Sequence, residues 1–503
     1  MVVEPWSEQK IQAALNKENS DYVVKIEQVH ISVFLGSIDL EAIKVYSKQD
    51  TGINHAIHGE IAWIKLAGIS RFKALFKNDF DIREIFISDP KISVKLPPPT
   101  QEKKPHIVSP VNVRIGKIHV ENLDLAVKNL GASKFFSLKN GHLEVHEVQV
   151  SKKDTLSSRV AEKVNFNFRE FLLISSDSLY SLTLKDVDYD LTKAIFSIDT
   201  FLIHPNYKDY DFTSRHKYET DRIDGTFINI AAHDFSLADY LKSLDFKSTY
   251  LEIGKMNLDV FRDKRKVFPP FNRPTLQQLI YDYPALLNVD SVGVLRGDVF
   301  YREHAEEANE AGSISFNKIK AKIYNITNDT IYRTQSKFLE LKSEALVMGK
   351  GKLIISIKAK LFDKLDAFSL TGHLAAMDAK ILNPILEKNA FLFVTSGDID
   401  AMNFNIEANN NRATGSMTLR YQGLDIALKN KRTDDTTGLK ERVVSWIADL
   451  KIVDSNPLPG EAVRTGIIDY ERDPQRFFFN YASKAILTGI QSSLEKNPKK
   501  KKK

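Results

Sequence analysis

The feature that most constrains this chain is an alternation of apolar and polar residues from about residue 21 to 430. A period of two residues predicts β-strands with one apolar and one polar face. Because few segments have helical periodicity, we expect a mainly β fold: an elongated, twisted antiparallel sheet with a few short helices at its ends and edges. In residues 178–191 the apolar members of the alternation, with one slip of phase, are Leu182, Leu184, Val187, Tyr189 and Leu191.

The pattern divides the chain into regions. Residues 1–20 contain an amphipathic helix over 3–18, and residues 21–430 form the repeating β region. Residues 431–495 form a C-terminal helical cap, and residues 496–503 are a disordered polybasic tail. The phrase Ile115-Gly-Lys returns as Ile253-Gly-Lys, which indicates related strands at irregular spacing. Short helices are expected at Ser70–Asn78, Ser157–Val164, Ser236–Leu244, Pro274–Tyr283, Met377–Glu387, Leu439–Leu450 and Pro474–Leu494.

Composition excludes several classes of protein. The 503 residues are 43% hydrophobic and 27% charged, which is typical of an ordered protein. Cysteine is absent, so disulfides, thiolate metal sites and a cysteine nucleophile are excluded. The net charge is +6, and the tail carries six lysines, which leaves the rest near neutral (6 − 6 = 0). We therefore expect no nucleic-acid partner. The tail itself is either a solvated end or an electrostatic contact with anionic lipid.

Motifs of enzymes are missing from the sequence. It holds no phosphate-binding loop, no dinucleotide fingerprint and no nucleophile elbow, so we expect neither an enzyme nor a cofactor. His142, Glu144 and His146 share one strand face, but residues four apart on a strand lie about 13 Å apart, too far for one metal ion. They are interpreted as a polar stripe. No metal site is expected.

Several phrases nevertheless resemble the AsmA-like envelope family (AsmA/TamB-type). The last third carries Leu382-Asn-Pro, Ser396-Gly and Gly415-Ser-Met-Thr-Leu-Arg-Tyr-Gln-Gly-Leu424, which is similar to the C-terminal region of that family. The phrase at 85–94 and the helix leading into 24–45 resemble its N-terminal part. The resemblance implies a U-shaped repeating β-groove over 21–430, similar to bridge-like lipid-transfer proteins.

The resemblance also implies a location. Family members are anchored in the inner membrane of Gram-negative cells by a transmembrane helix preceding the segment that matches residues 3–20. Met1–Trp6 lacks the basic region and apolar core of a signal peptide, and no apolar run has the length of a spanning helix. A periplasmic, inner-membrane-associated location is therefore expected from the resemblance, with phospholipid as ligand, the inner membrane as partner and an outer-membrane partner as a further expectation.

The expected function is a non-enzymatic lipid-transfer groove that carries phospholipid acyl chains between inner and outer membrane. The alternative is an envelope scaffold for outer-membrane biogenesis, made of closed β-sandwiches without lipid. The groove-lining candidates are Ile31, Val33, Leu123, Leu125, Leu182, Leu184, Leu251, Ile253, Ile314, Phe316, Ile355 and Ile357. Residues of the C-terminal amphipathic helices, expected either to dock on the groove's end or to contact a membrane or partner, are Trp446, Phe477, Phe478, Phe479 and Tyr481.

Overall fold

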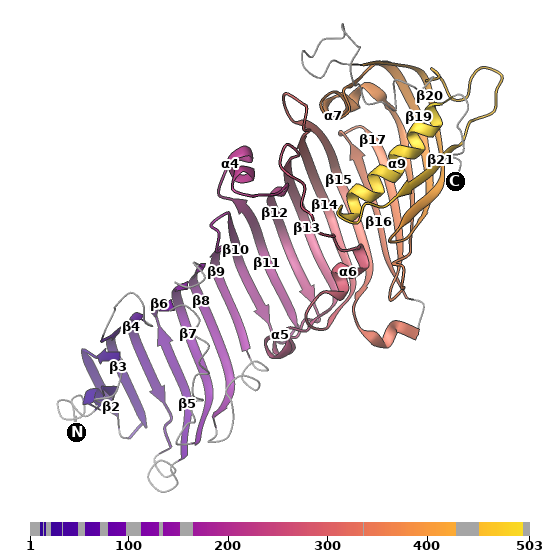
Figure 1. Cartoon of the computed structure of the whole chain (residues 1–503). Coiled ribbons are helices and arrows are strands. Elements are labelled where there is room, and N and C mark those ends of the chain that lie inside the picture. The colour runs from indigo at the N-terminus through magenta and orange to yellow at the C-terminus, as the bar shows by residue number, and fades with distance from the viewer. Residues whose placement is uncertain are drawn as a thin grey trace. The chain divides into compact units, whose positions relative to one another are not determined.

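The computed structural model of the protein describes residues 11–13, 15–16, 22–32, 34–48, 56–70, 79–96, 112–129, 134–150, 164–334, 337–428 and 452–495. Strands dominate, and the helices are few and short (Figure 1). The mainly β fold class is therefore confirmed. The chain divides into two compact units. Unit 1 is Met1–Asn206 with Ile228–Phe246, and unit 2 is Tyr207–Phe227 with Lys247–Lys503.

Unit 1 is built on one sheet in which successive long strands are antiparallel neighbours. Two positions are each filled by a pair of shorter strands: β1 and β2 both pair with β3, and β5 and β6 both lie between β4 and β7. The β5–β7 and β6–β7 ladders are parallel, which the purely antiparallel expectation missed. The strands are β1 Tyr22–Lys25, β2 Gln28–Ser32, β3 Ser37–Ser47, β4 Ala56–Ala67, β5 Asp79–Ser88, β6 Lys91–Leu96, β7 Asn112–Asn129, β8 Lys134–Val150, β9 Val164–Ile174, β10 Tyr180–Asp190 and β11 Ile195–Pro205.

Left-handed residues inside the strands explain the slip of phase seen in the sequence. Asp186 in β10 has φ 46°, and the pairing with β11 passes from Lys185–Thr200 to Val187–Ile198 across it. No residue is inserted, because the same number of residues separates these pairs on both strands. Phe168 and Phe171, the β9 partners of Val187 and Leu184, have ring centroids 6.3 Å apart, so Val187 lies on the same face as Leu184. Asp and Asn tolerate this conformation because their short side chains bond locally. The same device recurs at Asn122 in β7 and Asn140 in β8.

In unit 2, each strand from β14 to β21 pairs antiparallel with the next strand in the chain. β12 contributes its first residues to unit 2 and its last to unit 1, while β13 belongs to unit 2 apart from Phe246. The strands are β12 Asp221–His233, β13 Phe246–Asp263, β14 Leu287–His304, β15 Gly312–Thr327, β16 Phe338–Val347, β17 Gly351–Lys360, β18 Phe368–Asp378, β19 Leu392–Ala408, β20 Arg412–Leu428 and β21 Gly466–Glu471.

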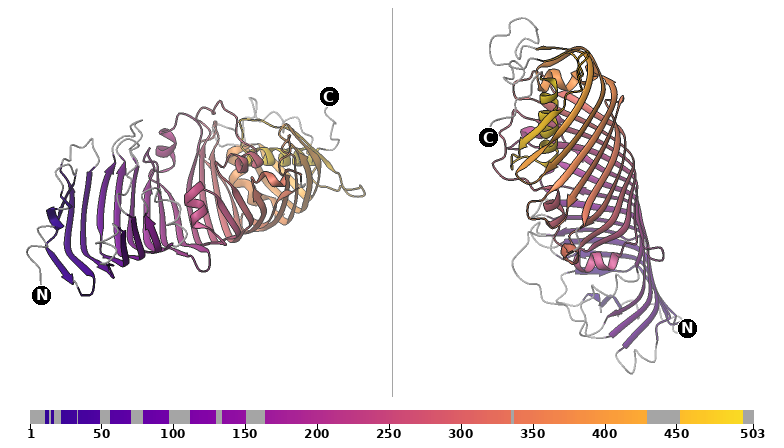
Figure 2. Two further views of the ribbon diagram at one scale, coloured as in Figure 1. Left: turned by 90° about the horizontal axis from the view of Figure 1, so that it is seen from below. Right: turned by 90° about the vertical axis from the view of Figure 1, so that its right-hand side faces the viewer.

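Helix α9, Phe478–Leu494, covers the concave face of the unit 2 sheet (Figure 2). It packs closely because Gly489 lacks a side chain: a methyl group there would lie 2.7 Å from Cγ1 of Ile468. Two hydroxyl groups of α9 also accept backbone N–H groups from the edge strand β21, Ser492 from Ile467 (2.9 Å) and Thr488 from Asp469 (3.3 Å). This covers an edge that would otherwise be open to pairing.

The other helices are short. Helix α5 begins after the N-cap Ser236, whose side chain accepts from the Asp239 N–H, and α6 begins with a capping box of Thr275 and Gln278. They are α4 Asp209–Ser214, α5 Leu237–Ser243, α6 Leu276–Tyr281, α7 Asn383–Asn389 and the 3₁₀ turns η2 Thr330–Thr334 and η3 Ala379–Leu382.

Most of the expected helices are therefore present as α5, α6, η3 with α7, and α9, whereas α4 and η2 were not expected. The expected helices at 70–78, 157–164 and 439–450 lie outside the described residues, apart from Ser70, which is not helical, and Val164, which begins β9. Of the N-terminal helix, residues 11–13 and 15 are helical, and Ile11 packs against a cluster around Ile26, Val29 and Ile43. None of the helices in the described part of the chain has the length and apolar character needed to cross a membrane.

Candidate functional site

The apolar face of unit 1 consists of side chains that line up in register across the strands. Residues directly opposite each other in a ladder share a face. Row 1 follows one such line from β2 to β11: Val29, Leu40, Ile64, Ile87, Val120, Leu143, Phe166, Tyr189 and Phe196. Row 2 follows another from β1 to β11: Val24, Val45, Gly59, Ile92, Leu125, Leu138, Phe171, Leu184 and Phe201. No charged or amide side chain interrupts either row.

Row 2 remains in partial contact with solvent. All of its side chains from Val24 to Phe201 are partly exposed; Gly59, which has none, is buried. A comparable row in unit 2 is shielded: Leu370 and Ile406, directly opposite each other, are 2% and 1% exposed. Sequence alternation is the same in both units, but helices and core residues cover this face in unit 2. Apolar side chains that form a contiguous exposed patch are a common feature of binding surfaces.

The predicted lining residues fall into two environments. In unit 1, Leu125 and Leu184 lie in row 2, and the registers of Ile31, Leu123 and Leu182 place them on the same apolar face, all partly exposed. In unit 2, Leu251 and Ile253 on β13 are also partly exposed.

The remaining unit 2 candidates belong to a covered core. Ile357 is buried, and Ile314, Phe316 and Ile355 pack against the same cluster. Val33 lies outside the described residues.

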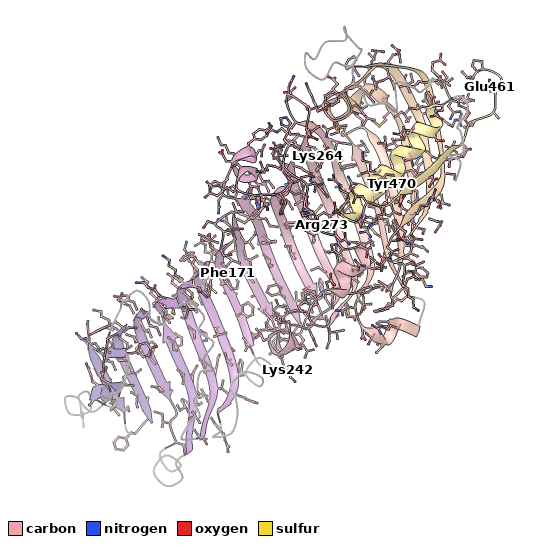
Figure 3. All side chains as sticks on the ribbon, in the orientation of Figure 1. Phe171, Lys242, Lys264, Arg273, Glu461 and Tyr470 are labelled. Atoms are coloured by element: carbon pink, nitrogen blue, oxygen red, sulfur yellow. The ribbon has the colours of Figure 1, made fainter. Side chains whose placement is uncertain are left out.

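Aromatic residues of the unit 1 face were not singled out from the sequence. Phe171, labelled in Figure 3, packs against Phe136 and Phe168, with ring centroids 5.9 and 6.3 Å apart. Phe166 stacks on Phe168 at 6.0 Å, and Tyr189 contacts Phe235 edge to face. The spacing of the Phe residues in 166–171 is the sequence feature that could have indicated them. Their rings form one aromatic surface only when the neighbouring strands pair.

The C-terminal aromatic candidates mostly pack inward. Tyr481 is 2% exposed and donates its hydroxyl to the Asn409 carbonyl oxygen, and burial raises its pKa. Phe478 meets the ring of Phe368 at 5.1 Å. Phe477 precedes α9 and lies under the Arg273 guanidinium at 4.6 Å.

Phe479 is the exception among these aromatic residues, since it is 83% exposed. Trp446 lies outside the described residues. Of the two expectations for this segment, docking on the sheet describes Tyr481 and Phe478. Among the candidates that the structure describes, Phe479 is the one whose ring is exposed.

The opposite face of the unit 1 sheet carries paired charges. The carboxylate of Glu144 contacts the Lys117 ammonium at 3.2 Å and the His146 ring at 2.5 Å. Burial opposes ionisation of Glu144, but these two partners hold its pKa below the usual value. His142 sits opposite Asn167. Across the described ranges, no cluster of three or more His, Asp or Glu side chains is arranged to hold a metal ion.

An ionic row borders the apolar face of unit 2 and was missed from the sequence. Tyr301 is the partner of the core-packed Ile314, so Tyr301 and Glu303 face the covering helices. Glu303 accepts from Lys264 (2.6 Å), Tyr301 (2.6 Å) and Asn389 of α7 (2.5 Å). Burial opposes its ionisation, but Lys264 and these donors keep its pKa below the usual value. Figure 3 labels Lys264 within this row.

The same row continues through Arg262. Its guanidinium pairs with Asp221 and lies 3.5 Å from Glu219, which also receives Arg476 at 3.4 Å. Burial raises the pKa of Glu219. Buried charges survive only where paired in this manner. The apolar surface of unit 2 is thus bordered by charged side chains that form ion pairs with one another.

Comparison with protein-family models and with curated proteins gave no match for this chain. The resemblance to AsmA-like proteins consequently rests on the short phrases described above.

Proposed function

We propose that the chain is a non-enzymatic lipid-binding and lipid-transfer protein, which holds phospholipid acyl chains on the apolar face of its sheet. The observation that carries this proposal is row 2. Its residues follow one another in register from Val24 to Phe201 without a polar side chain, and they keep partial access to solvent. A ligand that covers such a face must itself be apolar along its length.

Acyl chains fit that requirement on energetic grounds. Each methylene group removed from water contributes about 0.8 kcal/mol, and the covered side chains contribute as well. Neighbouring strands lie about 4.8 Å apart, so a row forms a continuous track across the sheet. Movement along such a track needs no nucleophile, metal ion or cofactor. The charged head groups stay in solvent, so binding does not have to remove them from water.

The resemblance to AsmA-like proteins adds a cellular setting to the proposal. In that setting the protein is periplasmic, associates with the inner membrane, and passes phospholipid toward the outer membrane or a partner there. The phrases around Leu382-Asn-Pro and Gly415–Leu424 support this part of the proposal.

A second function, an assembly scaffold without lipid, is favoured by unit 2. There α9 and the neighbouring helices cover the apolar face, and Leu370, Ile406 and Ile468 are almost fully buried. If the face of unit 1 is likewise covered by protein in the cell, the chain acts through its surface and not through a lipid.

The deciding experiment is lipid analysis of the full chain purified without detergent. We expect phospholipid to be extracted and identified by mass spectrometry in proportion to protein. A photoactivatable fatty-acyl probe, with its attachment sites assigned to single residues by fragmentation, should label row 2 residues such as Leu125 and Leu184 and spare outward residues such as Thr200. Absence of lipid together with labelling of both faces alike would overturn the proposal in favour of the scaffold.

A further inference from the structure

A basic hollow lies at one corner of unit 2, where β15 leads into β16 and β17 turns into β18. The hollow measures about 510 Å³, and residues 360–365 and Arg333 line it. Arg333 belongs to η2, the helical turn drawn in salmon that projects beyond the strand ends in Figure 1. Lys337 and Phe338 adjoin it at the start of β16. We call these residues, with the turn after β17, the basic corner.

The cations of the basic corner are mostly free of carboxylate partners. Lys360 lies 3.6 Å from Asp363. For Arg333, Lys337 and Lys364, no carboxylate of the described residues lies within ion-pair distance. Arg333 and Lys337 instead lie over aromatic rings, at 5.7 Å from Phe362 and 3.6 Å from Tyr332. Gln335 and Ser336, which lie between Arg333 and Lys337 in the sequence, carry no charge. An excess of positive charge is therefore available to an outside anion.

The unpaired cations of the basic corner contrast with paired lysines on the outer face of β15, β16 and β17. There Glu344 lies between Lys320 (3.6 Å) and Lys352 (2.9 Å), and Glu340 pairs with Lys358 (3.4 Å). These three strand-face lysines thus have carboxylate partners, whereas Arg333, Lys337 and Lys364 have none among the described residues. The difference is not explained by a general excess of lysine in unit 2.

The loop that shapes the hollow is held in place by its own hydrogen bonds. Asp363 accepts the N–H groups of Leu365 (3.0 Å) and Ala367 (3.3 Å), and Lys360 N–H donates to the Ala367 carbonyl (2.9 Å). The Phe362 ring stacks on Tyr281 at 5.2 Å. The hollow therefore exists before any ligand arrives, which reduces the ordering cost of binding.

Apolar side chains project from the same corner. Ile331 is 62%, Leu365 50% and Phe338 38% exposed. A soluble anion such as inorganic phosphate gains nothing from them. An anionic membrane surface interacts with both features of the corner. Its phosphate groups pair with the cations, and the apolar side chains are buried at the boundary between head groups and acyl chains.

We propose that the basic corner docks unit 2 onto an anionic phospholipid surface. Arg333, Lys337 and Lys364 contact phosphate groups, and Ile331 and Leu365 enter the boundary between head groups and acyl chains. This site is separate from row 2 and does not require that acyl chains occupy that row. It supplies a place at which the protein meets a membrane.

The test is co-sedimentation of the full chain with vesicles of phosphatidylcholine alone or with added phosphatidylglycerol. The variant R333E/K364E is compared with K255E/K350E, which changes charge equally at exposed positions away from the corner. The polybasic tail is present in every protein. Each basic side chain at such a surface strengthens binding about fivefold, so the corner variant should bind the anionic vesicles at least about thirtyfold more weakly. The control variant should bind like the parent, and circular dichroism should show both folded.

Several outcomes would overturn the proposal. One is equal loss in the two variants, which would assign binding to net charge. Another is parent binding that does not depend on phosphatidylglycerol or persists at about 1 M salt, where the Debye length is about 3 Å. Full competition by inorganic phosphate would assign the hollow to a soluble anion. Lipid carried by the purified protein tests row 2 alone, so the two proposals fail by different measurements.

Discussion

Leu184 of β10 lies directly opposite Phe171 of β9, and both side chains keep partial access to solvent on the apolar face of unit 1. In unit 2 the corresponding kind of pair, Leu370 opposite Ile406, is almost fully buried beneath covering elements. Two apolar pairs in equivalent antiparallel ladders thus have different surroundings. The difference separates a face that can receive a ligand from a face that forms a core.

A charge placed in row 2 should remove lipid without unfolding the chain. We expect L184D to lower the amount of co-purified phospholipid several-fold, because an acyl chain would have to desolvate the new carboxylate. The matched control is T200D, on the outward face beside Lys185. Lipid content is measured by mass spectrometry and folding by circular dichroism. Equal lipid in L184D and the parent would contradict the role of row 2.

The left-handed residue in β10 gives a stability prediction. Asp186 has φ 46°, a conformation that costs a β-branched residue about 1–2 kcal/mol. D186V should therefore lower the free energy of unfolding by about that amount, measured by urea denaturation. D186G should be as stable as the parent or more so, because glycine adopts positive φ freely. If both variants lose the same stability, the backbone is not the cause.

The contact of α9 with the sheet should be sensitive to side-chain volume. G489L places atoms where a methyl group already lies 2.7 Å from Ile468 and 3.0 Å from Met417. Overpacking outweighs the gain in helix propensity, so we expect a net loss of about 1–2 kcal/mol in unfolding free energy. S483L, on the exposed side of α9, is the control and should change little. A G489L protein as stable as S483L would mean that α9 does not pack tightly.

The buried carboxylate Glu303 gives a prediction about pH. Its folded-state pKa lies below the ordinary carboxyl value of 4.5, so its stabilising effect is complete above that value and is lost as the pH falls through the folded pKa. E303Q should therefore lose about 3 kcal/mol at pH 7, where the Lys264 ammonium is left unpaired, and the difference from the parent should shrink in acid. The measurement is urea unfolding at several pH values.

The control for this pH prediction is E344Q on the exposed strand face, for which a far smaller loss is expected. A difference between E303Q and the parent that stays constant from neutral pH into acid would show that Glu303 is not ionised in the folded protein.

Much of the fold was predictable because it is local. Alternation around Leu182 and Leu184 predicts strands from the chain alone, and the capping residues Ser236 and Thr275 coincide with helix starts. Asp89-Pro90 lies between β5 and β6, where a proline, which has no N–H to donate to a ladder, is expected. Each of these features depends on residues within a few positions of one another.

The parts that were missed depend on distant residues. Glu219 and Arg476, partners in the ionic row, are separated by 257 positions in the sequence. The aromatic surface around Phe171 and the basic corner around Arg333 and Lys364 form only when separate strands and turns meet. No local pattern distinguishes these residues from ordinary surface or core positions.

That this protein is a sheet with an apolar and a polar face follows from its amino-acid sequence, because side-chain alternation is a property of a single extended strand. Where that apolar face is covered depends instead on how distant segments pack together. In unit 2 the chain folds α9 back onto Met417 and Ile468, and burial there is nearly complete. In unit 1 row 2 stays partly exposed. Coverage is a contact between distant segments, so the alternation within a single strand does not show where it occurs.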